Sequence, residues 1–79
     1  MKTRVHVFLK PGVLDVQGKA IEGALHTLGF ADVSGVRVGK TIELDLDTTD
    51  RAAAEAKAKA MAEQLLANTV IESYRVEVG

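Results

Sequence analysis

The sequence predicts an α+β protein with the element order β-α-β-β-α-β. Apolar residues alternate with polar ones in residues 3–10, 36–46 and 71–78, which is the period of β-strands. They recur every three or four positions in residues 16–28 and 48–68, which is the period of α-helices. This order is that of the ferredoxin-like arrangement, in which one antiparallel sheet carries two helices on one face.

The size and charge of the chain narrow the range of functions. Its 79 residues predict a single domain, residues 1–79. A domain of this size buries only about 60–65% of its unfolded surface, so association would add stability. The 10 basic and 11 acidic residues form no block of one sign, which disfavours nucleic acid and anionic membranes as partners. A start at Met1 without a signal-peptide pattern or a long apolar run predicts a cytoplasmic protein.

The first strand, expected at residues 3–10, has two different faces. The face expected in the core carries Val5, Val7 and Leu9. The other face mixes His6 and Phe8 with charged residues. Such a mixed face is expected to be covered by a partner or by a second copy of the chain.

The stretch from Lys10 to Phe30 is expected to form a turn and then an amphipathic helix. Pro11 and Gly12 end the strand, Asp15 is the expected N-cap, and Gly29 is the expected helix stop. The predicted buried stripe consists of Val16, Ala20, Ile21, Ala24, Leu25 and Leu28. On the opposite, solvated face we expect Lys19, Glu22 and His26.

Residues 36–46 are expected to form a hairpin that turns at Gly39-Lys40. A two-residue loop would place Val36 and Val38 on the same face as Glu43 and Asp45, which conflicts with the apolar pattern. A three-residue loop, or a bulge near Gly39, would align the two apolar sets. A sheet covered on both faces is the remaining way to reconcile the turn with the apolar pattern. Like the mixed face of the first strand, it would indicate an oligomer.

The second helix is expected within residues 48–68, with Thr49 or Asp50 as its cap and Asn68 at its exit. Its predicted buried stripe is Ala54, Ala58, Met61, Ala62, Leu65 and Leu66. The chain then ends in an alternating strand, with one apolar side formed by Tyr74, Val76 and Val78.

No catalytic, cofactor-binding or metal-binding residue is expected. His6 and His26 have no ligand at metal-site spacing, and the acidic run Glu43, Asp45 and Asp47 is typical of a solvated strand. There is no nucleophile motif and no phosphate-binding glycine loop, so Gly39-Lys40 is interpreted as a hairpin tip. Two Phe and one Tyr are too few for base stacking on an open RNA-binding sheet.

Three segments resemble a known family: KPGVLDVQGKAIEGALHTLGF, VSGVRVGKTIELDLD and LLANTVIESYRVEV. Together they are similar to PurS, the small subunit of formylglycinamidine ribonucleotide (FGAM) synthase in the purine pathway. The resemblance covers nearly the whole chain. Where the family usually has L-D-P-Q-G at the helix start, this chain has Val16 in place of proline.

The resemblance implies a non-catalytic subunit that forms homodimers. Its implied partners are the large ATP-dependent synthetase subunit, PurL, and the glutaminase subunit, PurQ. The implied role is to bridge these two and to help ammonia pass between them, while ATP and Mg²⁺ belong to the complex. Two other functions stay open: a dimeric small-molecule-sensing module of ferredoxin-like type, and a stand-alone enzyme on this scaffold.

The resemblance also offers matched positions, none of them catalytic. These are Asp15, Gln17, Gly18, Arg37, Gly39, Lys40, Glu43, Asn68, Tyr74 and Arg75. We expect Arg37, Lys40 and Arg75 to contact a partner, because arginine in particular holds carboxylates with paired hydrogen bonds; local pairing on the sheet surface is the alternative. Backbone roles in caps and turns are expected for Asp15, Gly18, Gly39 and Asn68.

Overall fold

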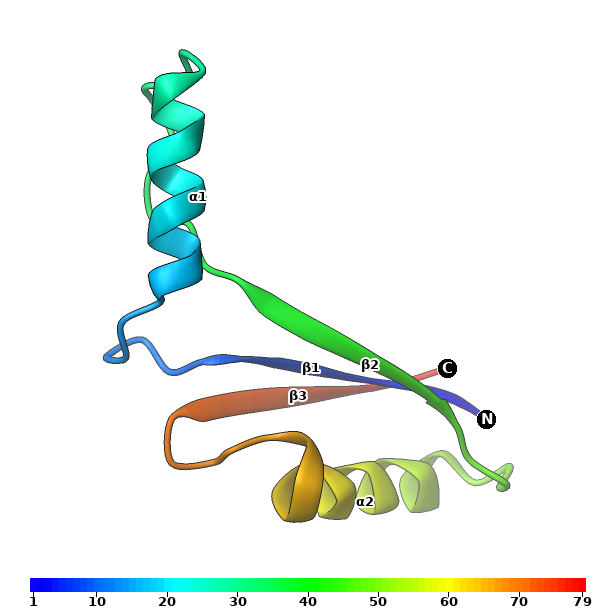
Figure 1. The fold of residues 1–79 in the computed structure, drawn as a ribbon. Helices are drawn as coiled ribbons and strands as arrows, with labels where there is room; N and C mark the ends of the chain where they lie inside the picture. Colours follow the sequence, from blue (N-terminus) through cyan, green and yellow to red (C-terminus); the bar gives the residue numbers. More distant parts are fainter.

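A computed structural model describes residues 1–79. The strands are β1 (Lys2–Leu9), β2 (Gly39–Asp45) and β3 (Glu72–Val78). The helical segments are α1 (Val16–Thr27), α2 (Arg51–Met61) and a π-helical turn, η1 (Ala62–Leu66), that directly continues α2. The strands form one antiparallel sheet in the order β2-β1-β3, and the predicted α+β class is confirmed (Figure 1).

The core lies between α2 and one face of the sheet. The central strand pairs Val5 with Ile42 of β2 and with Val76 of β3, so the apolar residues of all three strands share this face. Val5 and Val7 are fully buried there, as their alternation predicts. The buried core cluster is small and consists of Val5, Val7, Ala58, Ala62 and Ala67.

Helix α2 lies close to the sheet because its inner face is made of alanine. Asp50 caps it by accepting a hydrogen bond from the Ala52 amide at 3.0 Å, one of the two predicted caps. Ala54, Ala58 and Ala62 are buried, which confirms that part of the predicted stripe.

The apolar stripe of the second helix does not continue as predicted beyond Ala62. The amide of Ala67 donates to the Ala62 carbonyl, five residues back, and this wider turn changes which residues face the sheet. Ala67 is buried, whereas Leu65 is 82% exposed. Met61 is 37% exposed, so the prediction that Met61 and Leu65 are buried is wrong.

The predicted hairpin is absent in both of its proposed forms, so the order is β-α-β-α-β with three strands rather than four. Gly39 does not turn the chain; it begins β2 opposite Phe8 of β1. Residues 33–38, which we call the return segment, run back along α1 toward the sheet (Figure 1). The amides of Val36 and Val38 bond to side chains of the α1 region instead of to a neighbouring strand.

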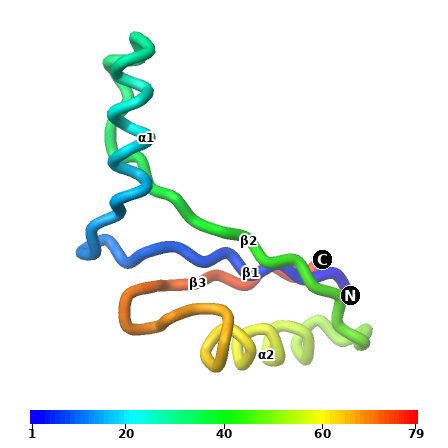
Figure 2. Tube along the Cα trace, in the orientation of Figure 1, coloured from blue at the N-terminus to red at the C-terminus, as the bar shows by residue number.

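The two helices do not share one face of the sheet. Helix α2 packs on β1 and β3, while α1 projects away from the sheet, joined to it at the end of β1 and the start of β2 (Figures 1 and 2). The chain is accordingly elongated, with principal extents of 48 × 24 × 14 Å. The expected placement of both helices on one face is therefore wrong within a single chain. We call α1 and the return segment, residues 15–38, the arm.

Candidate interaction surface

The apolar side of α1 is exposed from its first turn to its last, except for Leu25, which is half-buried. Val16 is 71% and Leu28 is 72% exposed, and Ile21 between them is 41% exposed. Ala20 and Ala24 on the same side are also exposed. We call these five residues the apolar stripe. Its periodicity was predicted, but the expectation that it is buried is wrong within this chain, because α1 has no sheet beneath it. A continuous exposed apolar face of this kind marks a binding surface.

The polar side of α1 faces the return segment instead. Glu22 accepts a hydrogen bond from the Val36 amide at 3.3 Å, and its side chain is only 18% exposed. His26 Nε2 lies 2.6 Å from the Val33 carbonyl oxygen. Lys19 and His26 are exposed, as expected, although His26 also contacts the return segment. Glu22 was expected to be solvated too, and for this residue the prediction is wrong. The helix is thus oriented by polar contacts, which leaves its apolar side free.

Asp15 joins the start of α1 to the start of β2. One carboxylate oxygen accepts from the Gly18 amide at 2.8 Å, which confirms the predicted N-cap. The other accepts from the Val38 amide at 2.7 Å. The hydrogen bonds from Val38 and Gly18 hold the pKa of Asp15 below its ordinary value. The cap was predictable from sequence, but the Val38 contact was not, since it spans 23 residues of chain.

Gly18 is buried where α1 touches the return segment. A Cβ on this residue would collide with the Val36 carbonyl oxygen and would lie 2.9 Å from a carboxylate oxygen of Asp15. Only glycine fits this approach. A backbone role was expected for Gly18, but as part of a cap or turn; the structure gives it a contact between two segments. Gly29, the expected helix stop, is confirmed by its φ of 99°.

The three residues expected at a partner interface lie in different places. Arg37 donates to the carbonyl oxygens of Leu9, Lys10 and Val13 at 3.4, 3.1 and 3.2 Å, and so braces the turn after β1. Lys40, near the start of β2, is exposed and forms no ion pair.

Arg75 lies on β3 opposite His6; it is exposed and, like Lys40, forms no ion pair within the chain. The structure therefore does not gather the three residues into one site. A shallow cavity of about 240 Å³ where the arm joins the sheet is lined by Asp15, Gln17, Lys40 and Glu72 among others.

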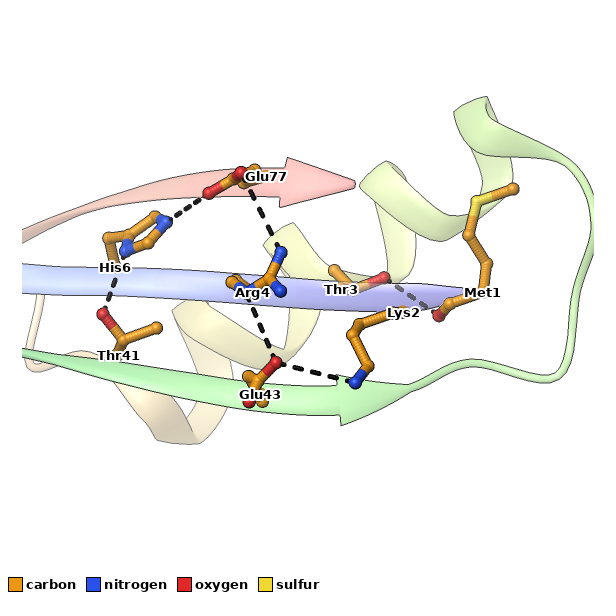
Figure 3. Close-up of polar contacts among 8 residues, drawn as sticks. All are labelled: Met1, Lys2, Thr3, Arg4, His6, Thr41, Glu43 and Glu77. Atoms are coloured by element: carbon orange, nitrogen blue, oxygen red, sulfur yellow. Dashed lines mark hydrogen bonds and ion pairs between the residues drawn. The ribbon is translucent and has the colours of Figure 1, made fainter. Parts of the chain in front are cut away.

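The face of the sheet opposite α2, which we call the open face, is mainly polar (Figure 3). Arg4 lies between Glu43 at 3.3 Å and Glu77 at 3.9 Å, and Lys2 is 3.8 Å from Glu43. His6 lies 2.7 Å from Glu77 and 3.0 Å from the Thr41 hydroxyl. The hydrogen bond from His6 holds the pKa of Glu77 below its ordinary value.

The charges of the open face are largely compensated within the chain. Its one large exposed apolar side chain is Phe8, which is 42% exposed. The expectation that this mixed face is covered by a partner or a second copy stays a prediction, and the larger exposed apolar surface lies on α1. No group of three His, Asp or Glu side chains is placed to hold a metal ion, and no helix is long and apolar enough to cross a membrane.

Comparison with known proteins identifies the family. The family model described as PurS, phosphoribosylformylglycinamidine (FGAM) synthase, matches residues 2–79. The chain belongs to the PurS family. The resemblance of its sequence to PurS is thereby confirmed. Among relatives, the FGAM synthase subunit PurS of Bacillus subtilis is 49% identical over 77 residues, which cover 98% of this chain and 90% of that one.

Solved PurS structures share the fold along nearly the whole chain. PurS of Methanocaldococcus jannaschii, described as one of the subunits of formylglycinamide ribonucleotide amidotransferase in the purine biosynthetic pathway, matches with a TM-score of 0.89 at 35% identity, covering 99% of this chain and 94% of that one. A chain in the structure of PurLQS from Thermotoga maritima matches with a TM-score of 0.87 at 32% identity. The match covers 96% of this chain and 93% of that one. These coverages include the arm as well as the sheet.

Proposed function

We propose that this PurS-family chain is a non-catalytic subunit of FGAM synthase that acts by assembly. In this proposal it forms homodimers and bridges the synthetase subunit PurL and the glutaminase subunit PurQ, so that ammonia passes between them without loss to water. The apolar stripe of α1 carries the proposal, because a helix whose apolar side is exposed along its length is built to be covered. The Thermotoga PurLQS structure, which contains a similar chain, supports PurL and PurQ as the partners.

A second copy of the chain is the proposed occupant of the apolar stripe. Helix α2 packs on β1 and β3, so the β2 half of the same sheet face, with Ile42 and Leu44 only half-buried, has no helix of its own above it. The α1 helix of a second copy can fill that half while its own sheet receives the first arm, which gives a two-fold symmetric interface. The two-helix layer that the sequence predicts would then form between chains rather than within one.

The energetic gain supports this pairing. Burying one side chain the size of Val16, Ile21 or Leu28 contributes about 1.5–3 kcal/mol before the costs of association. Two copies of the apolar stripe bury six such side chains. A chain whose own core is small gains more from this contact than a larger domain would.

Contacts with PurL and PurQ are proposed for the exposed cations. Lys40 and Arg75 have no ion pair in the chain, so both are available to hold carboxylates of a partner. Arg37 is proposed as a third contact, beside the turn that it braces. We assign ATP and Mg²⁺ to the synthetase subunit, since this chain carries neither a phosphate loop nor a cluster of acidic ligands.

Reconstitution tests the assembly proposal. The purified chain is titrated into PurL and PurQ while glutamine-dependent FGAM formation and co-elution are measured. We expect turnover to rise with the chain and all three subunits to elute together. The ammonia-dependent rate of PurL serves as the control, because it needs neither PurQ nor transfer. Unchanged glutamine-dependent turnover without co-elution would rule the proposal out, and saturable binding of glutamine or a purine nucleotide to the isolated chain would favour the sensing module.

A further inference from the structure

We infer that Asp15 and Gly18 are positioning residues for assembly, which lock α1 and the return segment into one rigid arm before a second copy binds. This inference rests on the proposed homodimer. It explains how the apolar stripe can be held in a fixed direction although α1 does not pack on the sheet of its own chain.

The arm is not held together by a hydrophobic core. Within residues 15–38 the only fully buried residues are Asp15 and Gly18, and the apolar Leu25, Val33, Val36 and Val38 are only half-buried. The large apolar residues at the ends of α1 point outward. We attribute the geometry of the arm mainly to specific polar contacts and to close backbone approach.

Asp15 provides the first of these contacts. Its carboxylate accepts from the amide of Gly18 inside α1 and from the amide of Val38 directly before β2. These bonds, at 2.8 and 2.7 Å, fix the first turn of the helix relative to the strand that enters the sheet. The side chain is buried, so water does not replace either bond at no cost.

Gly18 provides the close backbone approach between α1 and the return segment. Its missing side chain lets the Val36 carbonyl approach the helix, and an added methyl group would also press on the Asp15 carboxylate at 2.9 Å. Alanine at this position would separate the return segment from α1 and disturb the Asp15 bonds together. Gly23, one turn and a half further along the same helix, has nothing within 4 Å of an added Cβ, and is a matched control.

Further contacts extend the lock along the arm. Glu22 holds the Val36 amide and His26 holds the Val33 carbonyl toward the far end. At the near end, Arg37 binds the carbonyls of the turn that precedes α1. A partner thus meets an arm that is already ordered, which lowers the entropic cost of binding.

The test compares Gly18→Ala with Gly23→Ala by sedimentation equilibrium and by activity titration with PurL and PurQ. We expect Gly18→Ala to raise the dimer dissociation constant by about tenfold or more, and Gly23→Ala to change it by less than about threefold. In the titration, Gly18→Ala should need correspondingly more chain for half-maximal turnover but reach the same plateau. A merely damaged protein would instead lower the plateau.

Asp15→Asn keeps the test decisive if Gly18→Ala does not fold. Asparagine still caps the helix but accepts only one of the two bonds. We expect weaker dimers and faster hydrogen exchange at the Val38 amide. Dimers of wild-type affinity in both variants would overturn the positioning roles while leaving the homodimer intact. A wild-type chain that stays monomeric at all concentrations would overturn the homodimer itself, and the inference with it.

Discussion

Asp15 combines a local role with a long-range one. As an N-cap it satisfies the first turn of α1, and as an acceptor for Val38 it ties that turn to the sheet. These two bonds favour the ionised carboxylate and so lower its pKa in the folded chain. Stability from such a group is present above the ordinary pKa of 3.8 and is lost as the pH falls through the folded-state pKa.

The first prediction follows from the lowered pKa of Asp15. The urea midpoint of Asp15→Asn should lie below that of the wild type near neutral pH, because one hydrogen bond is missing. The gap should narrow as the pH falls below the ordinary aspartate pKa of 3.8, since protonation then removes the wild-type advantage. Midpoints followed by circular dichroism from about pH 7 to about pH 2 check this. A gap that is the same at every pH would contradict the assigned role of the carboxylate.

Ala58 sets the distance between α2 and the sheet. It is fully buried in the core cluster, whereas Ala56 on the same helix is exposed. We predict that Ala58→Leu destabilises the chain by about 1–3 kcal/mol through overpacking, and that Ala56→Leu is nearly neutral, within about 0.5 kcal/mol. Denaturant unfolding of the two variants measures the difference. Equal stabilities would mean that α2 does not lie against the sheet through this face.

At the scale of elements, the sequence determined which residues of α1 share a face but not which face its own chain would touch. Helical period alone cannot distinguish a stripe that packs inside the chain from one that packs on another molecule. The polar face of α1 contacts the return segment through Glu22 and His26. Nothing in the spacing of these two residues predicted that contact. The caps at Asp15 and Asp50 were predictable, because capping depends on residues close in sequence.

The prediction of a hairpin at residues 36–46 was wrong for a related reason. Val36 and Val38 alternate with polar residues as a strand would, and the pattern is real, but their amides bond to Glu22 and Asp15. Extended backbone satisfied by side chains looks the same in sequence as a strand satisfied by a neighbour. The conflict of faces at Gly39 was the one available sign that the chain does not turn there.

The start of α1 allows an element-scale prediction. Val16 is the first helical residue, a position where proline removes no helical hydrogen bond, and Asp15 before it already has the extended backbone that a following proline requires. We predict that Val16→Pro raises the free energy of unfolding by about 0.4–1 kcal/mol. Thermal unfolding at one fixed protein concentration is the measurement, because association also adds apparent stability. A loss of stability would show that the first turn of α1 is not formed as described.

At the scale of the whole molecule, the chain has a compact end and an exposed end. The sheet and α2 were largely predictable, since alternation and an alanine stripe describe a two-layer core. The direction of the arm was not, because a surface that is completed by another chain leaves only its apolar character in the sequence. The ion pairs of the open face were also not predictable, because Arg4 and Glu43 lie on different strands that are far apart in the sequence.

The central claim is that the apolar stripe of α1 is covered by a second copy. Sedimentation equilibrium of the wild-type chain, of Leu28→Glu within the stripe, and of Ala56→Glu on the outside of α2 tests it most directly. We predict that the wild type and Ala56→Glu sediment at twice the chain mass of 8.4 kDa, and that Leu28→Glu sediments as the monomer. A wild-type chain that is monomeric at all accessible concentrations, or a Leu28→Glu variant that dimerises as well as Ala56→Glu, would contradict the claim.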